Sequence, residues 1–362
     1  MVTAKTALLR PKDRYMLTRA LFALALSLTT AAPTRAQDAV SNFYKGRQLT
    51  VIIPSSVGGG YDLYGRLVAR HIGKHLPGNP NVVASNMAGA AGVVAAQYVY
   101  AAGAKDGTVL GLVYPNAILE PLTGDRGNVR YDSKRFAYIG SANAEVFVCY
   151  VSTKSGVNAF ADVFAREVVL GASGAGAPSS EYTAMYNNLL GAKIKVVAGY
   201  PGINEIGLAI EKREIDGTCG SSWATLTTGR PNWLRDDVVR VIAQENLAAH
   251  PDIVKLGAPL TLSFAKTPEQ KQVMEFVYSL ADFGRPFLMA PETPKDRVEA
   301  MRKAFSAMLA DREFLEDAAR MKMEIVNPMD GATLQSTVDK LMATPADVVD
   351  RVKKATGAGA GK

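Results

Sequence analysis

The chain has 362 residues, of which 48% are apolar and 21% are charged, so it is globular and long enough to form two lobes. The formal net charge of +7 is uneven, because residues 1–36 carry six basic residues and one acid (net +5). The remaining 35 basic and 33 acidic residues leave only +2. This near-neutral balance gives no indication of a nucleic-acid partner or of an acidic membrane surface.

Residues 1–36 have the parts of a secretory signal peptide. A basic stretch ends at Arg19, an apolar core covers Ala20–Leu28, and small residues lead to a cleavage site at Thr34–Ala36. The core is shorter than the roughly 20 residues of a membrane span. We therefore expect cleavage rather than an uncleaved anchor, and no cysteine follows the core to carry a lipid. The mature chain is expected to begin near Gln37 and to work in the periplasm.

A glycine-rich loop separates the first predicted strand from the first predicted helix. The strand covers Val51–Ile53, and apolar residues recur at helical spacing through Leu63–Ile72. Three consecutive glycines, Gly58–Gly60, lie between them. The first-turn N–H groups of a helix have no intrahelical partner, and glycines let that backbone approach a ligand closely. The loop therefore predicts an anion site, with a simple tight turn as the alternative.

The same loop does not fit a nucleotide. A Walker loop requires a lysine after the glycines, and a dinucleotide fingerprint requires a further glycine where the chain has Leu63. A small carboxylate or an inorganic anion remains as the predicted ligand. Asp62, in the first turn of the helix, is expected to brace the loop by accepting hydrogen bonds from its amides.

Strands and helices then alternate. We expect a strand at Asn81–Ser85, a helix at Ala91–Ala101 and a strand at Val109–Val113. This order is typical of right-handed βαβ units and predicts a mainly parallel sheet. Ligands of such sheets bind beyond the carboxyl ends of the strands. The loops Ser55–Gly60 and Tyr114–Asn116 both lie at such ends.

The pattern restarts after the apolar strand expected at Val146–Val151. A second glycine loop, Gly171–Ala177, lies between a strand at Val168–Leu170 and a helix at Ser180–Leu190. Three further strands are expected, at Lys195–Ala198, Ile215–Cys219 and Val238–Gln244. Two similar units predict two α/β lobes whose loops face one cleft.

The chain after Gln270 is expected to be helical. One helix should run over Pro294–Leu309 with Thr293 as its N-cap, and Asp311 should cap the next. The tail from Thr356 is expected to be disordered. The expected division is therefore a signal peptide at 1–36, a first lobe at 37–146 and 249–355, a second lobe at 147–248, and a tail at 356–362.

The cysteines and histidines indicate no metal site. Cys149 and Cys219 can form a disulfide in an oxidising compartment or remain two buried thiols, and the sequence leaves both open. His71 and His75 share one helix face and His250 is remote, so we expect surface histidines rather than zinc ligands. We expect no cofactor and no catalytic residues, since neither a Ser-His-Asp arrangement nor a G-x-S-x-G elbow is found.

Several runs together resemble the substrate-binding receptors of tripartite tricarboxylate transporters, the Bug family. In chain order they are VIIPSSVGGGYDLYGRLVARHIGKHL, NMAGAAGVVAAQYV, AKDGTVLGLV, YDSKRFAYIG, GYPG followed by a helix and REIDG, and PFLMAPETPKDRVEAMRKAFSAML. They cover nearly the whole mature chain.

The resemblance implies a two-lobed periplasmic-binding-protein fold of type II, the Venus flytrap, that closes on a small organic carboxylate. It implies a monomeric receptor without enzymatic activity that delivers its ligand to the membrane subunits of a tripartite transporter. A sensor that feeds a signalling pathway and, third, a periplasmic enzyme are the alternatives.

The resemblance also carries candidate site residues. In the family the first loop holds a carboxylate through backbone amides and waters, and the second loop adds contacts from the other lobe. The second loop departs from the family here, because its Thr is missing (Ser179 or Ser180 would replace it). Glu181 stands where many members have His, the Tyr200 turn lacks a Lys, and Gly220 stands where Asp is common. Tyr61 and Trp223 either line the pocket or pack. The candidate ligand-binding residues are Ser55, Ser56, Val57, Gly58, Gly59, Gly60, Tyr61, Asn116, Ser173, Gly174, Ala175, Gly176, Ser179, Tyr200 and Trp223.

Overall fold

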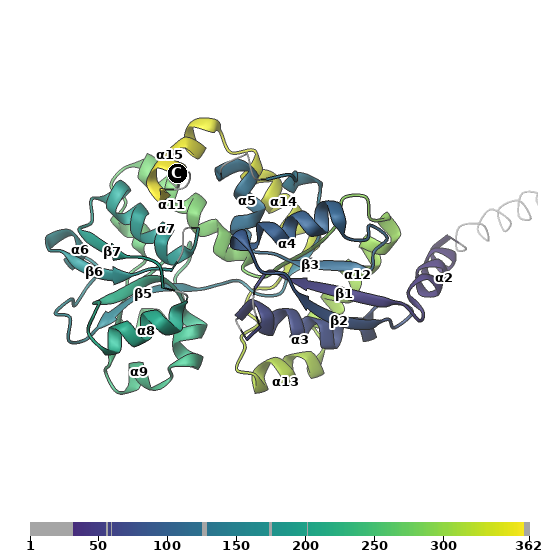
Figure 1. The fold of residues 1–362 in the computed structure, drawn as a ribbon, viewed down its shortest axis with the longest axis horizontal. Coiled ribbons are helices and arrows are strands. Elements are labelled where there is room, and N and C mark those ends of the chain that lie inside the picture. Colours follow the sequence, from purple (N-terminus) through teal and green to yellow (C-terminus); the bar gives the residue numbers. More distant parts are fainter. Residues whose placement is uncertain are drawn as a thin grey trace, which may run out of the picture.

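The computed structural model describes residues 32–55, 57–58, 60–124, 129–173, 176–200 and 202–357 (Figure 1). The expected signal peptide lies almost wholly outside these residues. So do Ser56, Gly59, Gly174 and Ala175 of the candidate site, and residues 358–362 of the expected tail. The described chain begins with helix α2 (Ala32–Tyr44), which projects from one end of the molecule.

Two sheets lie next to each other in Figure 1, and each is the centre of one lobe. The strand order of the sheet in the first lobe is β11-β4-β10-β3-β1-β2. Its strands are β1 (Gln48–Ile53), β2 (Asn81–Asn86), β3 (Val109–Leu112), β4 (Ala137–Ser141), β10 (Pro286–Met289) and β11 (Met329–Asp330). The order in the second lobe is β7-β6-β8-β5-β9. Its strands are β5 (Phe147–Ser152), β6 (Val168–Gly171), β7 (Ile194–Val197), β8 (Gly217–Ser222) and β9 (Val239–Gln244).

The two-lobed α/β fold is confirmed, but the sheets are mixed rather than mainly parallel. Strand β1 pairs parallel with β2 and β3, and β6 pairs parallel with β7 and β8. Strands β5 and β10 pair antiparallel with both of their neighbours. The physical reason is the chain path: each of these strands follows a crossing between lobes, so it enters its sheet from the opposite end. The sequence pattern predicted no strand at the positions of β4, β10 and β11.

Helices cover both faces of the first sheet. Helices α3 (Gly60–His75), α12 (Lys295–Leu309) and α13 (Arg312–Arg320) enclose one apolar cluster with it. Helices α4 (Val93–Gln97), α5 (Pro115–Thr123) and α14 (Gly331–Met342) lie on the other face. Met301, Phe305 and Met308 of α12 are fully buried, because they share one face of that helix.

The second sheet is also covered on both faces. Helix α7 (Pro178–Met185) lies on one side, and α8 (Ile203–Glu211), α9 (Asn232–Arg235) and α10 (Pro251–Lys255) enclose a separate apolar cluster on the other. The remaining helical segments are α6 (Asp162–Ala165), η1 (Ala90–Gly92), η2 (Tyr98–Ala102), η3 (Ser133–Arg135), η4 (Tyr186–Leu190), η5 (Thr225–Gly229), η6 (Thr261–Phe264) and η7 (Leu280–Phe283).

The end of the chain does not return wholly to the first lobe. Helices α11 (Pro268–Ser279) and α15 (Ala346–Thr356) pack against each other, and α15 packs against α7 of the second lobe (Figure 1). One buried apolar cluster consequently runs across both lobes, from Val113 through Tyr278 to Tyr186. The expected assignment of all of 249–355 to the first lobe differs from these contacts, because amphipathic periodicity does not say which sheet a helix covers.

Several local expectations are corrected. Helix α12 begins at Lys295 after Pro294, so Thr293 is not its N-cap. Asp311 does cap α13, accepting a hydrogen bond from the Glu313 amide. Thr356 ends helix α15 and is buried, so the ordered chain extends past the expected start of the tail.

His71 and His75 are not free surface residues. His71 Nε2 lies 3.0 Å from Asp317 Oδ2, and His75 Nε2 lies 2.8 Å from Asp311 Oδ2. Asp317 lies on α13 and Asp311 is its N-cap, so both histidines contact α13 from α3. Both histidine side chains are largely buried at this contact. None of the helices in the described ranges combines the length and apolar character of a membrane span.

Candidate functional site

A cavity of about 470 Å³ lies between the lobes, within the range of about 300–1,000 Å³ that small-molecule sites occupy. Both lobes contribute to its wall. Its lining residues are Tyr61, Tyr114, Pro115, Asn116, Glu145, Phe147, Ser173, Gly176, Ala177, Pro178, Glu181, Tyr182, Gly220, Leu280, Gly284 and Arg285.

Arg285, immediately before strand β10, is the cation of this cavity. Its Nη2 lies 2.6 Å from Glu145 Oε2, and the two side chains are only 9% and 6% exposed. Its guanidinium carbon also lies 4.2 Å from the ring centre of Tyr61 and 4.8 Å from that of Tyr64. Burial disfavours the charge, but Glu145 and the two tyrosines outweigh burial and hold the Arg285 pKa above its ordinary value.

Glu145 lies in the segment that crosses from β4 to β5. Its Oε1 accepts a hydrogen bond from Ser222 Oγ at 2.6 Å, and its main-chain carbonyl accepts one from Asn246 Nδ2. Each carboxylate oxygen therefore already has a partner. The pair with Arg285 joins the crossing segment to β10, and Ser222 adds a contact from strand β8.

Two tyrosines form an aromatic wall. The rings of Tyr61 and Tyr114 meet edge to face with centres 4.1 Å apart, and Tyr61 Oη donates to the Gly284 carbonyl at 2.6 Å. Burial raises the pKa of both phenols, so they are neutral hydrogen-bonding groups. Of the two alternatives left open for Tyr61, the structure places it in the cavity wall.

The expected loop brace is confirmed. Asp62 is 2% exposed, and its carboxylate accepts hydrogen bonds from the Gly58 amide, Arg66 Nε and Asn86 Nδ2. Asn86 also donates to the Ser55 carbonyl, which ties strand β2 to the loop. Burial alone would raise the Asp62 pKa, but the hydrogen bonds from Arg66, Gly58 and Asn86 outweigh it and lower the pKa below its ordinary value.

The brace changes the interpretation of the first loop. The Gly58 amide is already used by Asp62, and Val57 is 73% exposed outside the cavity lining. Ser55 and Gly60 are also absent from the lining, although a Cβ on Gly60 would lie 3.6 Å from Arg285 Nη2. Of the described first-loop candidates, Tyr61 alone lines the cavity, and the start of helix α3 lies beside Arg285.

In the second loop, Ser173 and Gly176 line the cavity and Ser179 does not. Ser179 is buried, and its Oγ accepts a hydrogen bond from the Ser173 amide, so it braces the loop. Ser180 Oγ donates to the Ser173 carbonyl. Neither serine therefore takes the ligand-facing place of the missing Thr, because both are used within the loop.

Asn116 joins the two lobes across the cavity. Its Nδ2 donates to the Gly176 carbonyl and to Glu181 Oε2, both at 3.0 Å. Burial raises the Glu181 pKa to about 7, against the effect of the Asn116 hydrogen bond. Asn116 was expected at the site, and the structure gives it a partner carboxylate that the sequence did not indicate.

Tyr200 and Trp223 lie away from the cavity. Trp223 is 6% exposed and packs in the apolar cluster beneath the second sheet, and Tyr200 packs partly buried against the same cluster. The open alternative for Trp223 is thereby resolved as packing. Both residues follow predicted strand ends, but their side chains pack in the apolar cluster that α8, α9 and α10 enclose and are absent from the cavity lining.

Gly220 is required by its backbone. Its φ is +65°, and a Cβ there would lie 2.4–2.5 Å from backbone atoms of Pro178 and Ser179. The aspartate common at this position in the resembling family has no room in this arrangement, because α7 begins directly against β8.

Sequence reasoning missed Arg285 and Glu145 as site residues. The one available signal was that each residue is a single charge directly before or near the start of an apolar strand. Arg285 lies between Gly284 and the strand that begins at Pro286, and Glu145 precedes the strand that begins at Phe147. Nothing local connects the two residues, since they are far apart in the chain.

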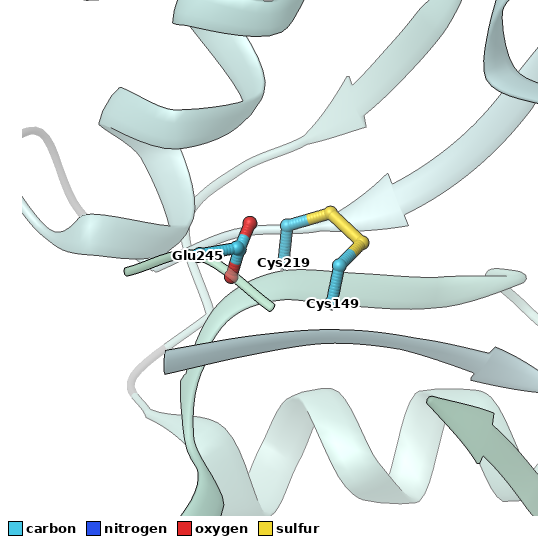
Figure 2. Close-up of side chains that lie close together, drawn as sticks. All are labelled: Cys149, Cys219 and Glu245. Carbon is cyan, nitrogen blue, oxygen red and sulfur yellow. A yellow bond between two sulfur atoms is a disulfide. The ribbon is translucent and has the colours of Figure 1, made fainter. Parts of the chain in front are cut away.

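Of the two alternatives left open for Cys149 and Cys219, the structure shows the disulfide, which joins neighbouring strands β5 and β8. Figure 2 shows the carboxylate of Glu245 beside it. Because metal binding by cysteine requires a thiolate, these three side chains are not a metal site while the disulfide is formed. Glu245 instead accepts hydrogen bonds from Tyr186 Oη and the Gly220 amide.

Comparison with known proteins finds solved structures of the same fold. No family model matches the chain, and no curated protein matches it. A TctC solute binding protein from Polaromonas aligns with a TM-score of 0.64 and 18% identity, over 85% of this chain and 99% of that one. An R. palustris protein with adipate aligns with a TM-score of 0.64 and 20% identity, over 86% and 98%. MatC from Rhodopseudomonas palustris with bound malate aligns with a TM-score of 0.59 and 18% identity, over 84% and 99%. The chain thus has the fold of periplasmic solute-binding proteins, the fold that the sequence resemblance implies.

Proposed function

We propose that this protein is a periplasmic receptor that captures a small organic carboxylate between its lobes and performs no chemistry on it. The observation that carries the proposal is a cavity of ligand size with a buried guanidinium, Arg285, at the start of helix α3. Guanidinium groups and helix N-termini both favour carboxylates. The aromatic wall of Tyr61 and Tyr114 supplies apolar contact for the ligand's carbon skeleton.

The cellular role follows from the resemblance and the fold together. We propose that the signal peptide directs the chain to the periplasm, where it acts as a Bug-type receptor for the membrane subunits of a tripartite transporter. The structural neighbours whose names include adipate and malate support a carboxylate as the ligand class. Arg285, rather than the first-loop amides, is the main anion contact in this receptor, since the Gly58 amide donates to Asp62.

A thermal-shift screen tests the proposal. The protein, purified from the periplasm of its expression host, is heated with mono-, di- and tricarboxylates and aromatic acids. A ligand that binds only the folded state raises the melting temperature by mass action. At a ligand concentration roughly 100-fold above the dissociation constant, the free energy of unfolding rises by about 2.7 kcal/mol. We expect a shift with one class of carboxylate that disappears in Arg285→Gln. No shift with any organic acid would refute the receptor proposal.

A further inference from the structure

The charged groups of the cavity do not match a ligand with negative charge at both ends. The charged side chains among its lining residues are Arg285, Glu145 and Glu181. Glu145 already offsets the charge of Arg285 at 2.6 Å. Glu181 then leaves the cavity with either no net charge or a negative one. A second ligand carboxylate would have no cation to meet within this lining.

Glu181 is placed to accept a hydrogen bond from a ligand. Its Oε2 accepts from Asn116 Nδ2, whereas its Oε1 has no hydrogen-bond partner among the described residues. The amide orientation of Asn116 is fixed by its surroundings, because Nδ2 faces two acceptors, the Gly176 carbonyl and Glu181. The hydrogen bond from Asn116 occupies Glu181 Oε2. Glu181 Oε1 therefore remains as an acceptor beside the cavity.

Arg285 is the group in the lining that suits the ligand carboxylate. Its Nε is buried and has no hydrogen-bond partner, although the side chain lines the cavity and is only 9% exposed. It lies beside the first residue of helix α3, where unpartnered amides and the helix dipole favour negative charge. Arg285, which precedes β10 of the first lobe, is thus suited to an anion, and Glu181, on α7 of the second lobe, is suited to a hydrogen-bond donor.

We propose that the ligand is an amino acid or a similar carboxylate that carries an ammonium group, and that Glu181 selects it by accepting a hydrogen bond from that group. The inference rests on the proposed receptor function and narrows its ligand class. The Glu181 carboxylate is only partly exposed. Withdrawing a carboxylate from water is unfavourable unless it is paired, and a ligand ammonium supplies the pair. A dicarboxylate of equal length would instead place two carboxylates together and bind more weakly.

Isothermal titration tests this selection with a matched series of ligands. For each chain length, an ω-amino acid is compared with the dicarboxylate and with the unsubstituted monocarboxylate, and α-amino acids are included. We expect an amino acid to bind the wild-type receptor at least about tenfold more tightly than its matched dicarboxylate, a difference of about 1.4 kcal/mol.

Two variants separate selection from a general effect on binding. Glu181→Gln keeps the shape and the Asn116 contact but removes the charge, so we expect it to weaken amino-acid binding about tenfold and not to weaken dicarboxylate binding. Glu167→Gln, an exposed position outside the cavity, is the matched control and should change neither affinity.

The possible results distinguish the two proposals. If dicarboxylates bind the wild-type protein as tightly as the amino acids or more tightly, the selection by Glu181 is overturned and the receptor function stands. Equal weakening of both ligand classes by Glu181→Gln would also overturn it. If no carboxylate of any class binds, the receptor function fails and this inference fails with it.

Discussion

The guanidinium of Arg285 and the carboxylate of Glu145 face each other at 2.6 Å, and both are almost fully buried at the junction of the two lobes. The pair connects strand β10 to the segment that crosses into the second lobe. An unpaired buried charge is strongly unfavourable, so each residue stabilises the buried charge of the other in the cavity wall. The pair is at once a structural connection and the source of the cavity's cation.

Removing one partner of this pair should destabilise the fold strongly. We expect Glu145→Ala to lower the free energy of unfolding by roughly 3–5 kcal/mol, because it leaves Arg285 buried and unpaired. Denaturant unfolding measures this change. The double variant Glu145→Ala/Arg285→Ala should lose less than the sum of the single variants. Additive losses would show that the pair does not couple. Arg312→Ala, in the exposed pair with Glu316, is the control and should change stability by less than about 1 kcal/mol.

Asp62 should stabilise the first loop. Asp62→Ala leaves the Gly58 amide without its acceptor and Asn86 Nδ2 with only the Ser55 carbonyl, so we expect a loss of roughly 2 kcal/mol and faster hydrogen exchange of the Gly58 amide. The Asp62 pKa is lowered in the folded state. Its contribution is therefore present above the unfolded pKa and is lost as pH falls through the folded one. Unchanged exchange at Gly58 would contradict the brace. Asp236→Ala, at an exposed ion pair, serves as control and should have little effect.

Gly60→Val should block binding without unfolding the protein. A Cβ at Gly60 meets nothing closer than Arg285 Nη2 at 3.6 Å, and its φ is not in the left-handed region. The added methyl groups should crowd the guanidinium where we place the ligand carboxylate. We expect at least about a tenfold loss of affinity, or ~1.4 kcal/mol, with a near-normal melting temperature. If this variant kept full affinity, the start of α3 would not be part of the binding site. Gly60→Ala is the matched smaller change.

Glu245 should make stability depend on pH. Burial raises its pKa to about 8, although the hydrogen bonds from Tyr186 and Gly220 act in the opposite direction. Between the ordinary carboxyl pKa of about 4.3 and 8, the folded state binds the extra proton, so stability should fall as pH rises through this window. Glu245→Gln mimics the protonated form and should reduce that dependence, with the remainder due to Glu181, whose pKa is also raised, to about 7. Parallel pH profiles for the variant and the wild type would show that Glu245 is not its source.

The disulfide should contribute substantially to stability. Cys149 and Cys219 close a loop across 70 positions of the chain, which in the chain-entropy model is worth about 4 kcal/mol. We expect Cys149→Ala/Cys219→Ala to unfold at a clearly lower denaturant concentration, and added reductant should have no further effect on this variant. An unfolding midpoint equal to that of the wild type would contradict this contribution.

Local patterns were sufficient for much of the fold. The apolar run Val51–Ile53, the three glycines and the helical spacing after them placed β1, the first loop and α3, because propensity and periodicity act over a turn or two of chain. The Asp62 brace could be predicted for the same reason, since Asp62 and Gly58 are four residues apart. Strand β10 was missed because it is short and lies between long helical segments.

The sequence by itself determined the alternating α/β elements, the two glycine-loop units and the pairable cysteines, all of which depend on neighbouring residues or on residue type. Only the tertiary structure decided that Arg285 meets Glu145, that Asn116 meets Glu181, and that Trp223 packs away from the cavity. Those contacts join residues distant in the chain, and they depend on how two sheets and their helices pack. Packing is a property of the whole buried surface, and no local pattern encodes which distant side chains it brings together.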